Sequence, residues 1–126
     1  MATNERYTDA DYLSLPVPNN TASGAAVRVG TYSATNDLNL NGVAQTSTGA
    51  AGEPTGGNAT GYASVKLKGA FLLAVSTTTT LAVGDPVYIT SGNVLTPVST
   101  SNALFGHALS AKGATAGALV TVRIKN

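Results

Sequence analysis

The side chains that could carry out acid–base or nucleophilic chemistry are few in this chain and are spread along it. There is one histidine, His107, within LFGHALS, and there are no cysteines. The carboxylates are Glu5, Asp9, Asp11, Asp37, Glu53 and Asp85. A catalytic histidine needs a nucleophile and an orienting acid beside it, and no sequence signature marks either partner. We therefore expect His107 to be a structural or solvent-facing residue, and the chain not to be an enzyme.

Metal and cofactor sites are equally unsupported by the residue types. Metal sites need several His, Cys, Asp or Glu ligands, so only a calcium site built largely on carbonyl oxygens could be imagined, and no EF-hand spacing supports one. The Gly-rich stretch TGAAGEPTGG lacks the Lys-Ser/Thr of a phosphate-binding loop. Asp85 precedes Pro86 and is typical of a turn in which the carboxylate binds the turn backbone. The sequence thus predicts no catalytic, cofactor or metal site.

The charge pattern argues against nucleic acid as a partner. The formal net charge is +1, and only 10% of residues are charged, against about 25% in an average protein. Binding to phosphates needs clustered Lys and Arg, whereas the cations here are scattered. They are Arg6, Arg28, Lys66, Lys68, Lys112, Arg123 and Lys125. Two pairs of these cations lie two residues apart, as on one face of a strand, and predict solvated sheet faces. They are Lys66 with Lys68 and Arg123 with Lys125.

Signals for export or membrane insertion are lacking in the sequence. The start, MATNERYTDADY, is polar and carries charges of both signs, unlike a signal peptide. No apolar run approaches the roughly 20 residues that span a bilayer. We therefore expect a soluble protein made and used without export, in which the sequons at Asn19 and Asn58 are not glycosylated.

The elements that must position these residues read as short β-strands. The chain is rich in Val and Thr, whose branched side chains favour pleated surfaces. Strand signals recur at intervals typical of a β-sandwich or β-barrel, with Gly-bearing turns between them. We expect an all-β, single-domain protein with a bend or bulge at Gly69. The candidate strands cover residues 25–32, 38–44, 62–75, 86–90, 94–98, 104–111 and 118–126.

Two segments fall outside this strand pattern. Residues 1–18 are mostly polar and predict an extended N-terminal arm, followed by a single β-domain over 19–126. Pro16 and Pro18 remove backbone donors, which suits an edge or docking strand. Residues 45–61 are rich in Gly, Ser and Thr without periodicity, and we expect a long flexible loop there. A helix over Ala70–Val75 is the alternative to a strand, although the Thr run after it opposes extension.

Five short motifs, taken in order, resemble those of the phage capsid cement, or head decoration, proteins. The likeness covers residues 62–126 well and 12–44 loosely, with departures at Pro86 and in the longer 45–61 loop. The motifs are Val65-Lys66-Leu67-Lys68-Gly69-Ala70-Phe71, Gly84-Asp85-Pro86-Val87-Tyr88, Gly92-Asn93-Val94-Leu95-Thr96, Phe105-Gly106-His107-Ala108-Leu109 and Val120-Thr121-Val122-Arg123-Ile124.

The resemblance implies a structural virion protein rather than a catalyst. Such a protein is made in the host cytoplasm, binds the outer surface of a mature tailed-phage capsid and stabilises it by bridging capsomers. Its partner would be the major capsid protein, with self-association, as trimers, on the shell. It would need no cofactor, nucleic acid or membrane.

We expect the arm to contact the capsid, because it carries aromatic anchors and could add an edge strand to the shell. The hypothetical contact residues are Arg6, Tyr7, Asp11, Tyr12, Leu13 and Leu15. The alternative function is a receptor- or glycan-binding surface module of a virion that uses the 45–61 loop. That loop contains no aromatic side chain on which a sugar could stack.

Overall fold

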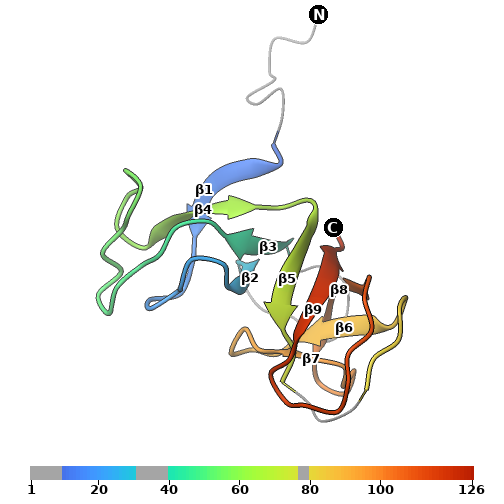
Figure 1. Cartoon of the computed structure of the whole chain (residues 1–126). Coiled ribbons are helices and arrows are strands. Elements are labelled where there is room, and N and C mark those ends of the chain that lie inside the picture. The colour runs from blue at the N-terminus through green and yellow to red at the C-terminus, as the bar shows by residue number, and fades with distance from the viewer. Residues whose placement is uncertain (1–9, 31–39, 77–79) are drawn as a thin grey trace, which may run out of the picture.

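A computed structural model describes residues 10–30, 40–76 and 80–126, and these residues form β-strands without any helix (Figure 1). All strand pairings are antiparallel. The predicted all-β class is therefore confirmed. The strands are β1 (Tyr12–Pro16), β2 (Ala26–Val29), β3 (Leu40–Ala44), β4 (Tyr62–Lys66), β5 (Ala70–Ala74), β6 (Pro86–Ile89), β7 (Leu95–Thr96), β8 (Ala103–Ala108) and β9 (Leu119–Ile124).

The first sheet has four strands in the order β1-β4-β3-β2. Its register places Leu13 opposite Val65 and Ala26 opposite Val43. The edge position of β1 confirms the edge strand expected from the prolines.

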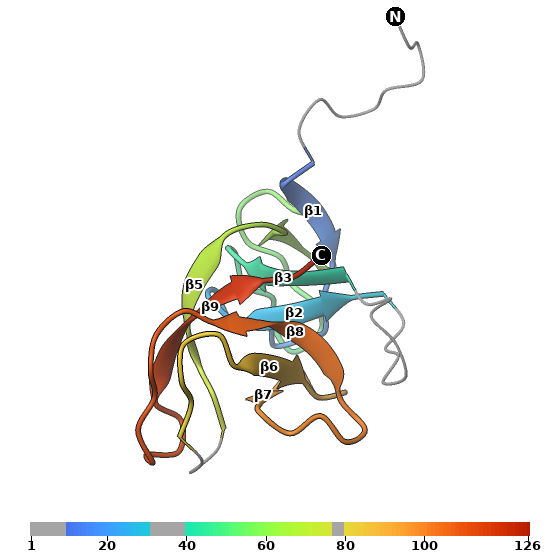
Figure 2. The same ribbon diagram turned by 90° about the vertical axis from the view of Figure 1, so that its right-hand side faces the viewer.

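The second sheet has five strands in the order β5-β9-β8-β6-β7. The N–H of Ser76, just after β5, donates to the carbonyl of Leu95 in β7 over 2.9 Å. That bond draws the two outer strands toward each other, so the sheet curls like half of a barrel (Figure 2). The structure thus resolves the sandwich-or-barrel alternative as two sheets, one of them strongly curved.

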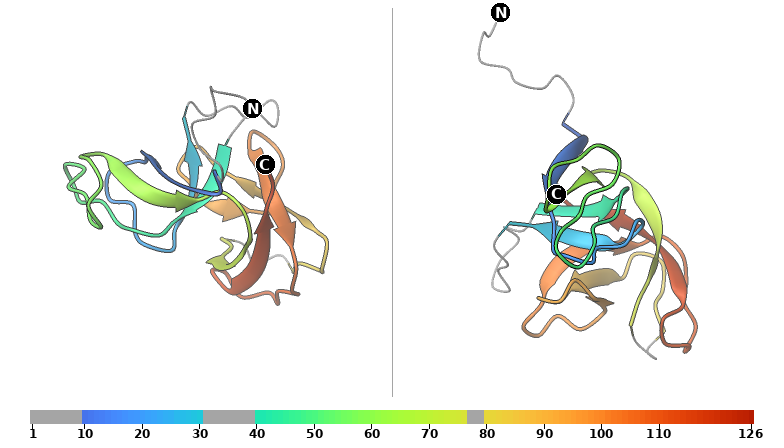
Figure 3. Two further views of the ribbon diagram at one scale, coloured as in Figure 1. Left: turned by 90° about the horizontal axis from the view of Figure 1, so that it is seen from above. Right: turned by 90° about the vertical axis from the view of Figure 1, so that its left-hand side faces the viewer.

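The main hydrophobic core fills the curved sheet and extends to the first sheet. Phe105 is its largest fully buried side chain. Among the described residues, β2 and β3 supply Ala26 and Val43 to this cluster, whereas β1 and β4 supply none. The view from above agrees, since β2 and β3 lie next to the five-stranded sheet (Figure 3). The other core residues are Leu73, Val75, Leu81, Val87, Ile89, Leu95, Ala103, Ala108, Val120, Val122 and Ile124.

A smaller cluster occupies the opposite face of the first sheet. Val27, Ala44 and Val65 are buried in it, and Leu15 and Val17 pack against them from β1 and the residues after it. Because side chains alternate between the faces of a strand, neighbours such as Ala26 and Val27 serve different clusters. The first sheet therefore has apolar residues on both faces.

The junction between the sheets is Gly69. Its φ is +120°, a backbone conformation that disfavours residues with a side chain, and its carbonyl accepts from the N–H of Ile124 over 3.0 Å. The bend predicted at this glycine is confirmed. It divides the strand expected over 62–75 into β4 and β5, one in each sheet, and the helical alternative for Ala70–Val75 is wrong.

A buried asparagine clamps the sheets together elsewhere. Asn41 in β3 is 2% exposed, and its Nδ2 donates to the carbonyls of Leu104 (3.0 Å) and Lys125 (2.9 Å) beside the second sheet. The amide of Asn126 in turn accepts from the Asn41 N–H (2.9 Å) and donates to the Asn41 carbonyl (2.8 Å). The Asn126 side chain thus makes the two backbone hydrogen bonds that a residue of a neighbouring strand would otherwise make with Asn41.

Candidate interaction surfaces

The reactive side chains are kept apart by the fold. His107 lies half-buried in β8, opposite Pro86 on one side and Arg123 on the other. The Asp85 carboxylate accepts from the N–H of Ala82 over 2.8 Å, which confirms the predicted capped turn. Within residues 10–30, 40–76 and 80–126, no group of three or more His, Cys, Asp or Glu could hold a metal ion.

The predicted N-terminal contact residues divide into three kinds. Asp11 and Tyr12 are exposed, and the Tyr12 side chain is 53% accessible. Leu13 and Leu15 are half-buried and alternate with the exposed residues of β1, and Leu15 packs on the small cluster. Arg6 and Tyr7 lie outside the described residues. Of the described contact residues, the consecutive pair Asp11 and Tyr12 is thus the exposed part, at the start of β1.

The outer edge of β1 is only partly open to another strand. The N–H of Leu67 donates to the backbone carbonyl of Asp11 (2.8 Å), and the N–H of Val17 donates to the carbonyl of Gly61 (3.0 Å). The backbone groups of the odd-numbered residues of β1 therefore face β4. Even-numbered residues direct their backbone groups outward. Pro16 and Pro18 fall on that outward side and have no N–H. The donors left on this edge of β1 are those of Tyr12 and Ser14.

The 45–61 loop contains a single isolated bridge, between Thr48 and Pro54, yet it is extensively hydrogen-bonded. Thr48 donates its N–H to the Thr21 carbonyl over 2.9 Å, and its hydroxyl oxygen accepts from the Thr21 N–H over 3.0 Å. Both threonines are buried at 7% exposure. The loop is thus fastened to the 18–24 turn, and its expected flexibility stays a prediction.

Glu53 ties the tip of this loop. Its carboxylate accepts backbone hydrogen bonds from its own N–H and from that of Ala51 (2.9 Å), and these bonds hold the pKa of Glu53 below its usual value of 4.5. The side chain is exposed. The bonds favour the charged form of the carboxylate, so ionised Glu53 supports the turn at Ala51.

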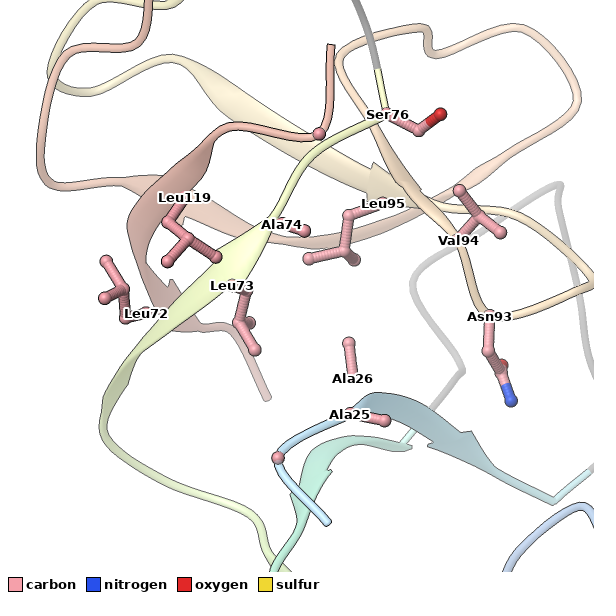
Figure 4. Close-up of a pocket in the computed structure, with 12 residues that line it drawn as sticks. Ala25, Ala26, Leu72, Leu73, Ala74, Ser76, Asn93, Val94, Leu95 and Leu119 are labelled. Atoms are coloured by element: carbon pink, nitrogen blue, oxygen red, sulfur yellow. The ribbon is translucent and has the colours of Figure 1, made fainter. Parts of the chain in front are cut away.

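An apolar groove of about 420 Å³ lies beside β5 (Figure 4). Leu73, Ala26 and Leu95 form its buried floor, and the close-up shows Leu73 directed toward Ala26. Leu72 and Leu119 stand at its rim with 62% and 59% of their surface exposed. No described residue that lines the groove is charged. The remaining lining residues are Gly24, Ala25, Ala74, Ser76, Asn93, Val94 and Gly117.

The strand beside this groove also presents open backbone groups. The N–H of Val75 donates to the carbonyl of Ala118 (3.2 Å), and the N–H of Ile124 donates to the carbonyl of Gly69 (3.0 Å). The backbone groups of the odd-numbered residues of β5 therefore face β9. Ala70, Leu72 and Ala74 direct their N–H and C=O groups to the other side, and among the described strands only β9 pairs with β5. Neither proline nor charge interrupts β5. Such an edge is competent to pair with another strand.

Sequence reasoning missed this groove, although a signal for it was present. The run Ala70–Val75 is continuously apolar, a pattern typical of strands buried on both faces. Ala70, Leu72 and Ala74, on the second face of β5, are exposed in the described structure, Leu72 by 62%. Together with exposed Leu119 and the apolar lining of the groove, Leu72 forms a contiguous apolar patch of the kind that marks a contact surface.

Comparison with known protein families gives a match over most of the chain. The model of a family described as phage cement protein matches residues 8–125. No curated protein matches the chain significantly, and no solved structure does. In the part of the chain that the structure describes, no helix has the length and apolar character to cross a membrane.

Proposed function

Because this chain belongs to the phage cement protein family, we propose that it binds the outer surface of a mature tailed-phage capsid and bridges neighbouring capsomers. Family membership makes it a structural protein associated with the capsid of a virion. The match over residues 8–125 is the observation that carries the proposal. Binding to the mature shell but not to its precursor would stabilise the mature state by mass action. No covalent step is required, so the protein acts by adhesion.

The exposed end of β1 is the proposed contact with the major capsid protein. Tyr12 offers a large amphipathic ring at 53% exposure, and aromatic residues are favoured anchors in protein interfaces. Asp11 beside it is exposed, and Arg6 and Tyr7 belong to the same proposed contact. Leu13 and Leu15 act here by fixing β1 against the body of the protein, because their side chains are half-buried.

The groove beside β5 is the proposed surface for self-association, as trimers, on the shell. Exposed leucines at its rim, a lining without charge and open backbone groups on β5 are the features that support this role. Burying an exposed leucine contributes roughly 1.5–3 kcal/mol. A contact of this size gives one copy only a modest affinity for its neighbour, but the overall affinity rises when many linked copies bind one shell.

The proposal is tested with mature heads that lack this protein and with precursor shells of the same phage. Purified protein is mixed with each, and bound protein is separated by sedimentation and quantified. We expect saturable binding to mature heads, little binding to precursor shells, and a higher disruption temperature for decorated heads. Equal binding to both shells, or no binding to mature heads, would exclude the proposed function.

The contact residues are tested in the same assay with Tyr12→Ala, which removes the exposed ring. The matched control is Tyr62→Ala in β4, because Tyr62 is also partly exposed, at 38%. Weaker occupancy for the first variant alone supports a contact at β1. Equal occupancy for both variants and the unaltered protein assigns the shell contact to another surface.

A further inference from the structure

One sequence in the chain is chemically labile and lies at the clamp between the sheets. Asn41-Gly42 is the one Asn-Gly pair in the sequence. In such a pair the backbone nitrogen of the glycine can attack the side-chain amide carbon of the asparagine. Glycine makes this attack easiest, because it has no side chain to hinder it and its backbone is the most mobile.

The structure requires both Asn41 and Gly42 at their positions. Asn41 must be an amide donor, since its Nδ2 faces three carbonyls, those of Leu104, Lys125 and, at 3.4 Å, Phe105. Gly42 must lack a side chain, because a Cβ there would lie 2.9 Å from the Lys66 carbonyl and would collide with the Val65 side chain. The fold therefore contains a labile pair that it cannot replace with a less reactive one.

The native structure opposes the reaction at both partners. Gly42 is paired with Val27 in the β2–β3 ladder. The N–H of Ala44 donates to the carbonyl of Ala25 in the same ladder over 2.9 Å. Because every second residue of a strand points its N–H to the same neighbour, the Gly42 N–H also points toward Val27. Asn41 is held in extended backbone by the Asn126 amide on its N–H and carbonyl. Attack needs the Asn41 backbone to rotate out of that conformation. Its 2% exposure also keeps out hydroxide and water.

We propose that Asn41 is a deamidation site which the fold keeps unreactive, and that its conversion prevents the chain from regaining this fold. Once the pair is released by unfolding, the Gly42 nitrogen loses its proton to hydroxide and bonds to the Asn41 Cγ. The Cγ–Nδ2 bond breaks and ammonia leaves with a proton from water. One water molecule then opens the cyclic imide to aspartate or isoaspartate, with no oxidant or reductant involved.

The product is incompatible with the clamp. A carboxylate has no N–H to donate, so its oxygens would face the three carbonyls that Nδ2 now satisfies. The Oδ1 of Asn41 is already buried without a hydrogen-bond partner, so the site offers no donor to accommodate a charge. Isoaspartate would in addition insert a main-chain carbon into β3 and shift its register.

The test compares Asn41 with a second Asn-Gly pair in an exposed turn of the same molecule. Ser91→Asn creates that pair in front of Gly92, in the exposed turn after β6, where the Gly92 N–H donates to the Thr90 hydroxyl over 3.2 Å and not to a neighbouring strand. The variant is incubated at mildly alkaline pH, in buffer and in strong urea, and peptide mass spectrometry follows conversion at each asparagine. We expect the introduced asparagine to convert in both conditions and Asn41 to convert at a comparable rate in urea only.

The second half of the test removes the urea and separates chains that regain protease resistance from those that do not. Chains converted at Asn41 should be found in the protease-sensitive fraction, and chains converted only at the introduced asparagine in the resistant one. Conversion of Asn41 in buffer as fast as at the exposed pair would overturn the protection. Equal refolding of chains with and without conversion at Asn41 would overturn its proposed consequence.

Discussion

At the residue scale, uncharged polar side chains do the work that ion pairs do in more charged proteins. Asn58 illustrates this, because its Nδ2 donates to the Thr55 carbonyl (2.8 Å) and the Thr46 hydroxyl (3.2 Å), while its Oδ1 accepts from Ser14 (2.6 Å). One amide thus joins the 45–61 loop to β1. The low charge of the chain is matched by a dense set of side-chain-to-backbone hydrogen bonds, which do not weaken with salt as surface ion pairs do.

Phe105 is the largest fully buried side chain of the main core, and truncating it should lower the stability of the fold. Phe105 is fully buried in β8 amid the main cluster. We expect Phe105→Ala to lower the free energy of unfolding by about 3–5 kcal/mol, because it removes apolar contacts and leaves a cavity. Urea titration followed by circular dichroism measures this loss. Leu109→Ala, at a residue that is 46% exposed, is the control and should change stability little.

Glu53 should give the loop an acid-sensitive tip. Its folded-state pKa is lowered from 4.5 by the backbone hydrogen bonds of Glu53 and Ala51, so the contribution of the carboxylate is present above the unfolded-state pKa and is lost as the pH falls through the folded-state pKa. NMR titration should give Glu53 a pKa below 4.5, with the Ala51 amide signal following the same curve. In Glu53→Gln that amide should not titrate in this range. A Glu53 pKa at or above 4.5 would contradict the hydrogen-bonded arrangement.

At the element scale, the two sheets treat their outer strands differently. The exposed edge of β1 carries Pro16 and Pro18, which remove donors and limit pairing with another chain. The exposed edge of β5 carries Leu72 between two alanines and has no such protection. In a protein proposed to assemble in many copies, the unprotected edge is the one we expect an assembly contact to cover.

The direction of the β1 backbone groups predicts different outcomes for proline at two adjacent positions. Ser14→Pro removes an N–H on the outward side and should leave the fold intact. Leu13→Pro removes an N–H that faces β4 and should be destabilising by about 1–3 kcal/mol, because a ladder hydrogen bond is lost and its acceptor in β4 is left unsatisfied. Thermal unfolding of both variants measures the difference. Ser14→Ala is the control for the lost bond to Asn58. Similar unfolding temperatures for the two proline variants would contradict the register of β1.

Alternation and turn residues made most of this fold predictable from sequence. The β2, β6, β8 and β9 strands lie within the predicted ranges or one residue outside them, and the short motifs of the second half led to the family that the match over 8–125 confirms. The fastening of the 45–61 loop was not predictable, because it depends on Thr21 and Thr48 meeting across 27 positions. The apolar run Ala70–Val75 gave a signal for an apolar face on β5, but the groove itself forms where β5, β7 and Ala26 converge, and that convergence is not encoded by the run.

At the scale of the whole molecule, the two proposed contacts lie in different places: β1 is an outer strand of the first sheet, whereas the groove lies beside β5 and β7 of the second sheet, with Ala26 of β2 in its floor. β1 lies at one end of the molecule and β7, which borders the groove, at the other (Figure 1). A bridging protein needs separate surfaces for the shell and for its own copies, because one surface used for both would make the two contacts compete. This separation means that each contact can be weakened without the other.

Leu72→Asp should therefore weaken self-association while leaving the folded subunit intact. Leu72 is 62% exposed at the groove rim, so the charge is solvated in the monomer but buried without a partner in the assembled form. Loss of the leucine contact alone would weaken association on the order of 10- to 100-fold. Sedimentation analysis over a concentration series measures this change, and thermal unfolding verifies the fold. Val98→Asp, at a position that is 53% exposed and does not line the groove, is the matched control. If the two variants associate alike, the surface that joins copies lies elsewhere than beside β5.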